Sequence, residues 1–519
     1  MKYLFFNGKI LTQNSNNKIA ECLLVVDNKI VFVGSKKELG DLDFGAKKID
    51  LKGKLLLPGF IDTHIHFHPY IKLSNYINLS FVKNIRELKT LLNKINLKEK
   101  KYLKGYGLKI SLFNKKKLNR LFLDRISNEI PIIFVSSDYH TYITNSKSIK
   151  LSKIDFKYIE KFKKKIGFLE KNNISLDNLD GYFYEDSYKI ILDNFPESNS
   201  YINLDKIINN FHKLGIVSIE EMAFNRDDFI FYDKVSLKNK IRVIRNFPQE
   251  LLDNDLYKLD NNWLKTGGLK LFYDGSLGSK TALLSKKYQN NLDYKGLRVN
   301  SKEEYLNYIN IYIKNIKKYK KRGSIITHAI GDKAISEVVE IYSMLRKKYN
   351  GILRIEHYQH VDDIILDKTV KNNIFVSMQP THLGADIDTI EEIGWIRDMS
   401  YRFNSIKNRD ITIGFSSDAP VETINPFLSI YSAITHSSYI NKKILNKDES
   451  ISVENAIKSY TIDAAKLSNS EKIRGSLEVG KLADLIIIDD YKKYDNNFWL
   501  DAKSYLTMID GKIVYLGEL

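Results

Sequence analysis

Apolar runs of strand length recur along the middle of the chain and alternate with stretches of helical periodicity. Residues 303–319 and 335–349 place apolar side chains three and four positions apart, which is typical of amphipathic helices. Strands that alternate with such helices predict parallel βαβ units, and eight of them would close a (β/α)8 barrel. The strand-like runs lie at 55–62, 131–138, 215–222, 268–275, 324–331, 353–360, 373–380 and 411–418.

Both ends of the chain consist of short apolar runs separated by turn residues such as Asp27-Asn28 and Asp510-Gly511. This pattern predicts β-hairpins at each end. We expect residues 1–57 and 470–519 to form one small composite β-sandwich domain, although two unrelated β caps fit the same pattern. The fold class is then α/β, with a TIM-like barrel over residues 58–469.

Two long connections interrupt the predicted barrel, at about 70–130 and at 139–210. Both are rich in Lys and Asn and contain only a few apolar positions that could anchor them. We interpret them as insertions that cover the mouth of the barrel.

The net charge of +18 comes from 81 Lys and Arg residues against 63 Asp and Glu residues. A sum of that size is compatible with a nucleic-acid partner. However, the lysines are dispersed over helix-like and loop-like stretches, and no patch of Arg and aromatic residues accompanies them. The charge therefore favours solvated faces, and we expect no nucleic-acid partner.

The single cysteine, Cys22, excludes an intramolecular disulfide and a Cys-rich zinc site. The first apolar run is broken at Asn7 and Gly8, which is too early for the core of a signal peptide. No run of about 18 apolar residues is present, so a membrane span is not expected. The prediction is a soluble cytoplasmic protein.

Metal-capable side chains stand at the ends of several predicted strands. His64 and His66 are two positions apart at the end of the first, so an extended backbone would point both the same way. His328, His357 and Asp418 end later runs. The C-terminal ends of barrel strands meet on one face. Imidazole and carboxylate are ligands that zinc-like cations prefer, so the pattern predicts a metal site there.

Longer motifs resemble those of the amidohydrolase superfamily, in its amidohydrolase-3 branch (YtcJ-like, N-substituted formamide deformylase-like). The resemblance runs from about residue 1 to 517 and implies a metal-dependent hydrolase built as a barrel with a composite β domain. It is carried by PGFIDTHIHF, GLKLFYDGSLGSKTALL, ITHAIGDKAI, RIEHYQHV, VSMQPTH, GFSSDAPVETINPF and SYTIDAAKLSNSEKIRGSLEVGKLADLIIID.

The resemblance assigns roles to the residues at these strand ends. It implies that His64 and His66 bind the more buried metal, and that His328 and His357 supply the other imidazoles. Asp418 then touches the metal and shuttles a proton. Lys270, on the fourth strand, matches the position where many members carry a carboxylated lysine that bridges two ions.

Two questions about the metal stay open at this point. The alternative for Lys270 is an ordinary ion pair with Asp274 or Glu221. The site therefore holds one or two divalent ions, with zinc the expected metal. Such a cation lowers the pKa of bound water from about 15.7 to about 7, which suits hydrolysis at neutral pH.

Further residues are assigned with structural alternatives beside them. His140 or His382 would stabilise an oxyanion, although His140 fits a structural role equally well. Glu185 resembles an acidic position of the family in the insertion and would bind the substrate, and a surface carboxylate is the alternative. Arg402 would bind an anionic group of the substrate, unless it forms a salt bridge.

One departure from the family pattern lies on the predicted third strand. Members commonly carry a His-Asp-like pair there, whereas this chain has Glu220 and Glu221. An acidic pair would change the polarity on the substrate side, so no relative's substrate transfers directly.

We predict hydrolysis of a C–N bond in a small amide, formamide or cyclic amide. A one-metal deaminase of the same fold and a non-catalytic scaffold are the alternatives. A small-molecule substrate is the expected partner, and the sequence leaves a homodimer open.

Overall fold

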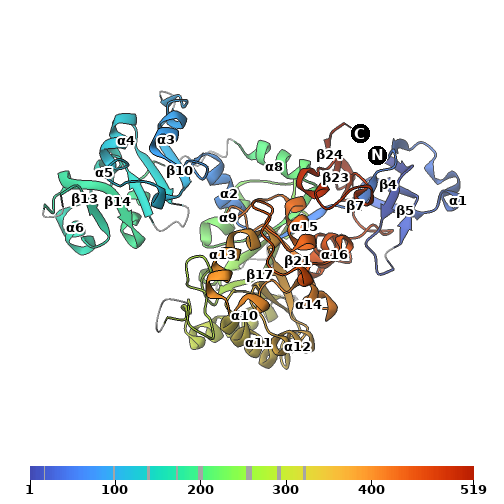
Figure 1. The fold of residues 1–519 in the computed structure, drawn as a ribbon. Helices are drawn as coiled ribbons and strands as arrows, with labels where there is room; N and C mark the ends of the chain where they lie inside the picture. The colour runs from blue at the N-terminus through green and yellow to red at the C-terminus, as the bar shows by residue number, and fades with distance from the viewer. Residues whose placement is uncertain are drawn as a thin grey trace. The chain divides into compact units, whose positions relative to one another are not determined.

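The computed structural model describes residues 1–16, 18–97, 100–136, 141–170, 173–196, 203–252, 260–288, 294–318 and 323–518. The chain divides into two compact units, one made of Met1–Pro69 with Asp205–Leu519 and the other of Tyr70–Leu204. Figure 1 shows the elements of both units, coloured along the chain.

The larger unit contains an eight-stranded parallel sheet that closes into a barrel, which confirms the predicted (β/α)8 fold. Every strand pairs in parallel with the next, in chain order. Main-chain hydrogen bonds from Asp418 N to His64 O (2.8 Å) and from His66 N to Ala419 O (2.9 Å) join the last strand to the first. The strands are β8 (Phe60–Ile65), β15 (Ile216–Met222), β16 (Arg242–Pro248), β17 (Leu264–Phe272), β18 (Ser324–Ala329), β19 (Ile352–His357), β20 (Phe375–Met378) and β21 (Ile413–Phe415).

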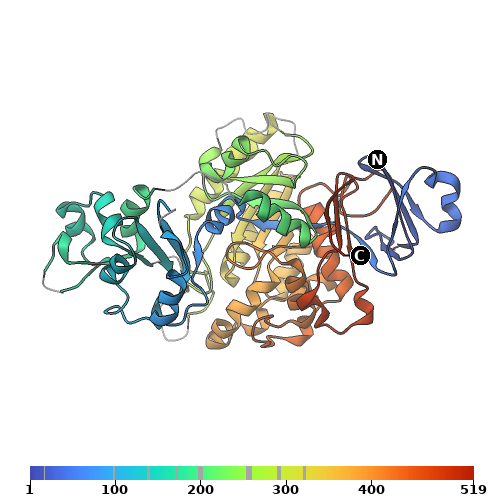
Figure 2. The ribbon, with the colours of Figure 1, turned by 90° about the horizontal axis from the view of Figure 1, so that it is seen from above.

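Most of these strands are buried on both faces, as parallel strands covered by helices are. Helix α11 illustrates why the covering segments are helical. Its buried residues, such as Ile335, Val338, Val339 and Tyr342, recur three and four positions apart and form one apolar stripe. Figure 2, seen from above, shows the helices around the barrel strands. The helices are α8 (Leu204–Lys213), α9 (Arg226–Lys234), α10 (Lys302–Lys318), α11 (Asp332–Arg346), α12 (Asp363–Lys371), α13 (Leu383–Ile393), α14 (Phe403–Asn408), α15 (Pro426–Thr435), α16 (Val453–Tyr460) and α17 (Ile462–Leu467).

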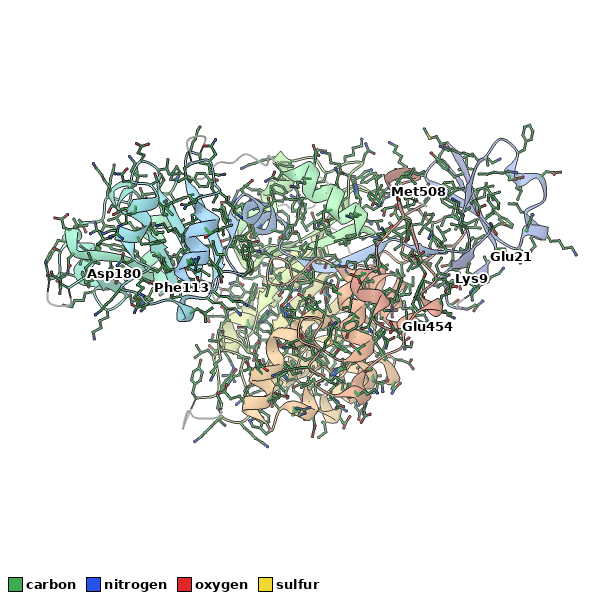
Figure 3. The ribbon with its side chains drawn as sticks, turned by 45° about the horizontal axis from the view of Figure 1, so that its top comes forward. Lys9, Glu21, Phe113, Asp180, Glu454 and Met508 are labelled. Atoms are coloured by element: carbon green, nitrogen blue, oxygen red, sulfur yellow. The ribbon has the colours of Figure 1, made fainter. Side chains whose placement is uncertain are left out.

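Two further sheets of the larger unit form a β domain beside the barrel. One has the order β5-β4-β1-β6, and the other, β24-β23-β22-β7-β2-β3, combines strands from both ends of the chain. Lys9 on β2 and Met508 on β23 both lie in this domain (Figure 3). One apolar cluster contains Phe5 and Val25 of the first sheet with Leu56 and Ile487 of the second, so the two sheets share a core. The strands are β1 (Lys2–Phe6), β2 (Lys9–Leu11), β3 (Ile19–Ala20), β4 (Cys22–Val26), β5 (Lys29–Gly34), β6 (Lys47–Asp50), β7 (Leu55–Pro58), β22 (Leu485–Ile488), β23 (Leu506–Ile509) and β24 (Lys512–Leu516).

The apolar run at 55–62 serves two sheets, because the chain changes sheet at Gly59. Strand β7 pairs with β22 in the composite sheet, whereas β8 starts the barrel. A Cβ atom on Gly59 would lie 2.3 Å from the side chain of Val217, so only glycine fits this close approach.

The smaller unit holds a mixed sheet of order β13-β14-β12-β11-β10-β9. Phe113 and Asp180, labelled in Figure 3, belong to this unit. Strand β11 lies in its sheet and pairs with β10 and β12, so the prediction of a barrel strand at 131–138 is wrong. An apolar run shows that a strand is buried but does not show which sheet buries it. The elements are β9 (Ile77–Asn78), β10 (Leu103–Leu108), β11 (Ile132–Ser136), β12 (Thr141–Thr144), β13 (Ile166–Phe168), β14 (Leu179–Tyr184), α3 (Ile85–Leu92), α4 (Arg120–Ile126), α5 (Ser146–Leu151) and α6 (Phe156–Phe162).

The barrel strand that replaces the run at 131–138 is β16, the third in order, which the apolar runs do not reveal. Consequently the Glu220–Glu221 pair lies on the second barrel strand and not on the third. Lys270, His328, His357 and Asp418 keep their predicted places at the fourth, fifth, sixth and eighth strands. Within the part of the chain that the structure describes, none of the helices combines the length and apolar character that a membrane crossing requires.

Candidate metal centre

The six side chains predicted as metal ligands come together at the C-terminal ends of the barrel strands. Five of them are buried, with Lys270 at 0% exposed, His64 at 1% and Asp418 at 5%. His328 is slightly more exposed, at 12% of its side chain. The ring centroids of His64 and His357 lie 5.0 Å apart, and those of His328 and His357 lie 4.4 Å apart.

Asp418 lies at the middle of this group. Its Oδ1 is 3.2 Å from Nε2 of His64 and 3.2 Å from Nε2 of His66. Donor atoms of His64, His357 and Asp418 all lie within 4.8 Å of one another, close enough to hold a single metal ion. Side chains from three separate strands therefore point their donor atoms at one location.

Each of these histidines has one ring nitrogen engaged by a neighbouring oxygen atom. Nδ1 of His64 lies 2.5 Å from Oε2 of Glu356, and Nδ1 of His66 lies 2.7 Å from the carbonyl oxygen of Met222. Nδ1 of His357 lies 2.8 Å from Oε1 of Gln379. A ring that donates through one nitrogen keeps a lone pair on the other, which is the usual arrangement of metal-binding histidines. The donor set therefore fits a divalent cation.

In His328 the other ring nitrogen, Nε2, is the one that is engaged. Its Nε2 lies 3.1 Å from the carbonyl oxygen of Gly275, so Nδ1 is the nitrogen left for a ligand. Burial lowers the pKa of His328 to about 3, and it also holds the pKa of His357 well below the usual range. Both rings are therefore neutral at pH 7, which is the state that binds a metal.

The pKa of Asp418 lies well below its usual range. Burial alone would raise that pKa, but the nearby His64, His66 and His357 outweigh burial and favour the carboxylate. Oδ1 of Asp418 is buried and has no hydrogen-bond partner among the described residues. An anionic oxygen in that state is costly unless a cation accompanies it.

Two of the proposed ligands sit on backbone in the left-handed region. His357 has φ +71° and Asp418 has φ +55°, and neither residue is glycine. Such conformations cost about 1–3 kcal/mol each and concentrate at functional sites. His357 is the last residue of β19, and Asp418 lies three residues after the end of β21.

Lys270 is fully buried, and its Nζ has no hydrogen-bond partner among the described residues. Nζ lies 4.9 Å from the centre of the Phe272 ring. Burial is the largest effect on this amine and lowers its pKa to about 8, against the attraction of Glu356 and Asp418. A substantial share of Lys270 is therefore the neutral amine close to physiological pH.

The alternative ion pairs of Lys270 are wrong. Asp274 accepts main-chain hydrogen bonds from Leu283, Ile330 and Gly331 at 2.8, 3.0 and 2.9 Å. Within the described chain, no hydrogen bond or ion pair joins Asp274 to Lys270.

The second alternative partner, Glu221, faces away toward the start of α2 (Phe67–Ser74) and toward α9. It accepts hydrogen bonds from the Tyr232 hydroxyl at 2.5 Å and from Phe67 N at 3.0 Å. Burial raises its pKa to about 8.

A buried ionic chain that the sequence analysis missed supports the centre from inside the barrel. Glu356 contacts His64 with Oε2, and its Oε1 lies 2.5 Å from Nε of Arg354. Arg354 also donates through Nη1 to Oε2 of Glu220 at 2.6 Å. All three charged residues are at most 1% exposed. Arg354 and His64 hold the pKa of Glu356 at about 2, although burial opposes this, so Glu356 stays ionised.

His382, which is not one of the six predicted ligands, also lies at the centre. It ends the short helix η7 (Pro380–His382) after β20, and its Nε2 lies 3.6 Å from Oδ2 of Asp418. The ring stacks 6.0 Å from that of His357. This position is compatible with its predicted contact with the substrate.

Three other predicted residues remain, and the structure describes the side chain of one of them, Arg402. Arg402 forms ion pairs with Asp363 at 3.0 Å and Glu449 at 3.3 Å, which favours the salt-bridge alternative. His140 lies outside the described residues. Glu185 begins the short helix η5 (Glu185–Tyr188) of the smaller unit, and its side chain lies outside the described part of the structure.

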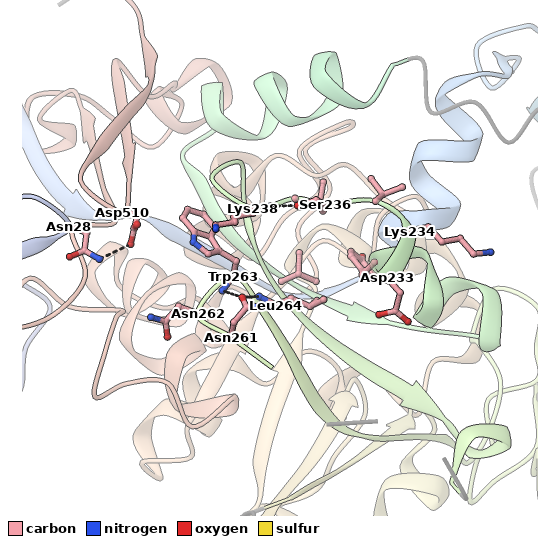
Figure 4. A pocket seen from close by; sticks show the side chains of 14 residues that line it. Asn28, Asp233, Lys234, Ser236, Lys238, Asn261, Asn262, Trp263, Leu264 and Asp510 are labelled. Atoms are coloured by element: carbon pink, nitrogen blue, oxygen red, sulfur yellow. Dashed lines mark hydrogen bonds between the residues drawn. The ribbon is translucent and has the colours of Figure 1, made fainter. Parts of the chain in front are cut away.

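A crevice of about 690 Å³ lies at the opposite end of the barrel (Figure 4). It is lined by the start of β17, including Trp263 and Leu264, and by residues 233–238. Asn28 of the β domain closes one side, where its amide donates to Asp510 at 3.3 Å. The N-terminal ends of barrel strands generally contribute stability, so this crevice is not the reaction centre.

The fold and the cluster of histidines with a carboxylate define a barrel hydrolase that works with a divalent metal. The family model described as "Amidohydrolase family" matches residues 47–515. This chain therefore belongs to the amidohydrolase family, in its amidohydrolase-3 branch, and is a hydrolase of carbon–nitrogen bonds.

Similar proteins support this assignment along the whole chain. Protein LONG AFTER FAR-RED 3 of Arabidopsis thaliana is 28% identical over 542 residues, covering 99% of this chain and 91% of its own. Putative amidohydrolase YtcJ of Bacillus subtilis is 26% identical over 549 residues, covering 99% of both. An uncharacterized metal-dependent hydrolase from Pyrococcus horikoshii, known from a crystal structure, is 25% identical with a TM-score of 0.77, covering 99% of this chain and 100% of that one.

Proposed function

We propose that this protein hydrolyses a carbon–nitrogen bond in a small non-peptide amide, formamide or cyclic amide with a divalent metal, zinc. The observation that supports this most directly is the convergence of His64, His66 and His357 on the unpartnered Oδ1 side of Asp418. Imidazole and carboxylate donors with lone pairs directed to one location suit zinc.

The proposed metal, Asp418 and His382 each have a separate role in the reaction. A divalent cation held by these side chains would supply a Lewis acid and lower the pKa of water. Asp418, ionised in this environment, takes a proton from the attacking water and returns it to the leaving nitrogen. His382, whose Nε2 has no hydrogen-bond partner among the described residues, donates to the oxygen that gains charge.

We propose that Lys270 is carboxylated and bridges two ions. A neutral amine can add carbon dioxide to give a carbamate and a proton, and the lowered pKa of Lys270 supplies that neutral amine. The carbamate is anionic and has two oxygen donors, whereas an ammonium group binds no cation. The buried Nζ without a hydrogen-bond partner supports this assignment over the one-metal deaminase, in which Lys270 is not a ligand.

The test is hydrolysis of a panel of N-acyl, N-formyl and cyclic amides by protein reconstituted with zinc. We expect at least one amide class to be hydrolysed, with no turnover by metal-free protein. Release of ammonia from aminopurines or aminopyrimidines without hydrolysis of any amide would identify the deaminase instead. Absence of both activities in protein that binds zinc would support the scaffold.

Location and assembly are proposed separately. The lone cysteine, Cys22, is buried and free, which suits a reducing compartment such as the cytoplasm, and cell fractionation tests this. A homodimer stays a prediction that light scattering tests. A small molecule is the proposed substrate, and retention on a nucleic-acid column that falls steeply with salt would contradict the prediction that no nucleic acid is bound.

A further inference from the structure

Two phenylalanine rings lie against imidazoles of the metal centre and have no part in the proposed reaction. The ring of Phe224, two residues after β15, stacks on that of His66 with 3.7 Å between centroids and 13° between planes. The ring of Phe272, at the end of β17, lies 5.4 Å from that of His328. The two phenyl rings are 5.9 Å apart and nearly parallel, at 18°. We call Phe224 and Phe272 the aromatic pair.

The position of Phe224 is fixed by hydrogen bonds of its own loop. Its main-chain N–H donates to Oδ2 of Asp228 at 3.1 Å, and Oδ1 of the same carboxylate lies 2.9 Å from Nδ1 of His68. Asp228 is buried in the first turn of α9, where its N–H donates to the N-cap Asn225 at 3.1 Å. The segments that follow β8 and β15 are therefore joined at Asp228, and the Phe224 ring is preorganised for a contact.

Phe224 is 48% exposed, although one face of its ring is covered by His66, and Phe272 is only partly buried. Isolated apolar side chains are common on protein surfaces. Here, however, the exposed ring contacts a proposed metal ligand, so a molecule bound at the metal lies within its reach. Covering that apolar surface removes it from water, which favours an apolar group of the bound molecule at this place.

The aromatic pair lies across the barrel from the groups that move the proton and bind the oxyanion. Phe224 follows the second strand of the barrel and Phe272 ends the fourth, whereas His382 follows the seventh and Asp418 the eighth. In a closed ring of eight strands, the second to the fourth face the sixth to the eighth. The metal centre therefore has phenyl rings on one side and the acid–base groups on the other.

This arrangement orients an amide at the centre. In the proposed reaction Asp418 returns a proton to the leaving nitrogen and His382 donates to the carbonyl oxygen, so nitrogen and oxygen both face these two residues. The three bonds of a carbonyl carbon spread in different directions within one plane. The remaining bond, which leads to the acyl substituent, then points toward the aromatic pair.

We infer that the aromatic pair binds the acyl portion of the substrate, so that the substrate is an N-acyl amide with an apolar acyl group. A formamide carries only hydrogen at that position and would leave the exposed part of Phe224 uncovered. The inference rests on the proposed function, from which it takes the roles of Asp418 and His382.

The test compares two isomeric amides, N-methylhexanamide and N-pentylacetamide, with zinc-loaded protein. Both contain the same atoms, but the pentyl chain is on the acyl side in the first and on the nitrogen in the second. We expect kcat/KM to be at least about tenfold higher for N-methylhexanamide, because burial of two methylene groups contributes about that factor. The ratio of the two values does not depend on the fraction of active enzyme in a sample.

Variants of Phe224 show whether its ring causes the preference. Phe224→Ala should bring the ratio close to one, and Phe224→Leu, which keeps an apolar side chain, should retain part of it. Phe44→Ala removes a phenyl ring that is 89% exposed between β5 and β6, and this matched control should keep the wild-type ratio. A ring that only held His66 in place would affect both isomers equally, so an unchanged ratio in Phe224→Ala would overturn the inference.

The outcomes for wild-type protein separate the inference from the proposed function. Equal kcat/KM for the two isomers, or a preference for N-pentylacetamide, would overturn the inference and leave the proposed function standing. If neither isomer is hydrolysed, calorimetric binding of hexanoate and acetate to zinc-loaded protein still decides. We then expect wild-type protein to bind hexanoate about tenfold more tightly than acetate, and Phe224→Ala to bind both alike. Equal binding of the two acids by wild-type protein would reject the inference.

Discussion

Oε2 of Glu356 lies 2.5 Å from Nδ1 of His64, in a place where both side chains are almost completely buried. Glu356 is the residue directly before His357, so one strand supplies both a proposed ligand and the carboxylate that orients another. Strand β19 thereby fixes the orientation of two imidazole rings.

Replacing Glu356 with Gln should weaken metal binding. The amide removes the negative charge that favours Nδ1–H on His64, and changes of this kind typically cost about 10- to 100-fold in metal affinity. Chelator competition measures the affinity. Glu337→Gln, which alters a carboxylate paired with the exposed Arg298, is the matched control and should bind metal as the wild type does. Unchanged affinity in folded Glu356→Gln would refute the orienting role.

Lys270→Ala should lose bound metal, and short carboxylates should restore it. The small side chain leaves space at a fully buried position, where acetate or propionate can supply the missing oxygen donors. Metal analysis before and after adding the carboxylate checks this. One equivalent of metal that survives Lys270→Ala, with undiminished activity, would contradict the bridge.

The bridge also predicts a pH dependence of metal uptake. Carbon dioxide reacts with the neutral amine, and the pKa of Lys270 is lowered to about 8. Below that pH the ammonium form predominates and carboxylation is suppressed, whereas above it the amine is free to react. Metal uptake by metal-free protein in bicarbonate should therefore rise between about pH 7 and about pH 9. Uptake that is equally fast without bicarbonate would count against carboxylation.

Asp418→Asn should retain metal and lose turnover. The amide keeps an oxygen donor but cannot accept a proton, and positioned acid–base groups contribute about 10²- to 10⁴-fold to rate. Steady-state kinetics on the best amide of the panel, with metal analysis of the same sample, provides the measurement. A fully active Asp418→Asn enzyme would show that the proton takes another path.

Arg354→Met should destabilise the fold by about 3–5 kcal/mol, because Glu220 and Glu356 would remain as buried charges without their partner. Urea unfolding of metal-free protein measures the difference. Arg409→Met removes a partly exposed arginine paired with the exposed Asp363 and Asp367 and should change stability by about 1 kcal/mol or less. Similar values for the two variants would show that the buried chain is not held by Arg354.

The sequence predicts the barrel well where strands are uniformly apolar. The runs at 215–222, 268–275, 324–331, 353–360, 373–380 and 411–418 all overlap barrel strands. It misses β16 because Arg242, Arg245 and Asn246 interrupt the apolar pattern. The charge of Arg242 is balanced by Asp484 and Asp510, which are 242 and 268 positions away. Such a distant pairing leaves no local signal.

For the site, too, the sequence does not reveal pairings between residues that are far apart in the chain. Strand-end histidines are visible as a pattern because the barrel imposes their position. Glu356 carries a weaker signal: Arg354 and Glu356 are two apart on one strand and therefore share a face. Their partners, Glu220 and His64, lie on other strands, so the ionic chain becomes evident only in three dimensions. The alternative partners of Lys270, Asp274 and Glu221, likewise turn out in three dimensions to be engaged elsewhere.

Because the composite sheet contains strands from both ends of the chain, it cannot be completed until the C-terminal strands have been synthesised. Lys9 and Asp490, 481 positions apart, form an ion pair across it, and β7 has β22 as its neighbour. At about 5–20 residues per second, ribosomes take tens of seconds to supply the second half of this sheet. During that interval β7 presents an unpaired edge to the cell, directly before the strand that carries His64. That edge is covered only when β22, from the last part of the chain, pairs with it.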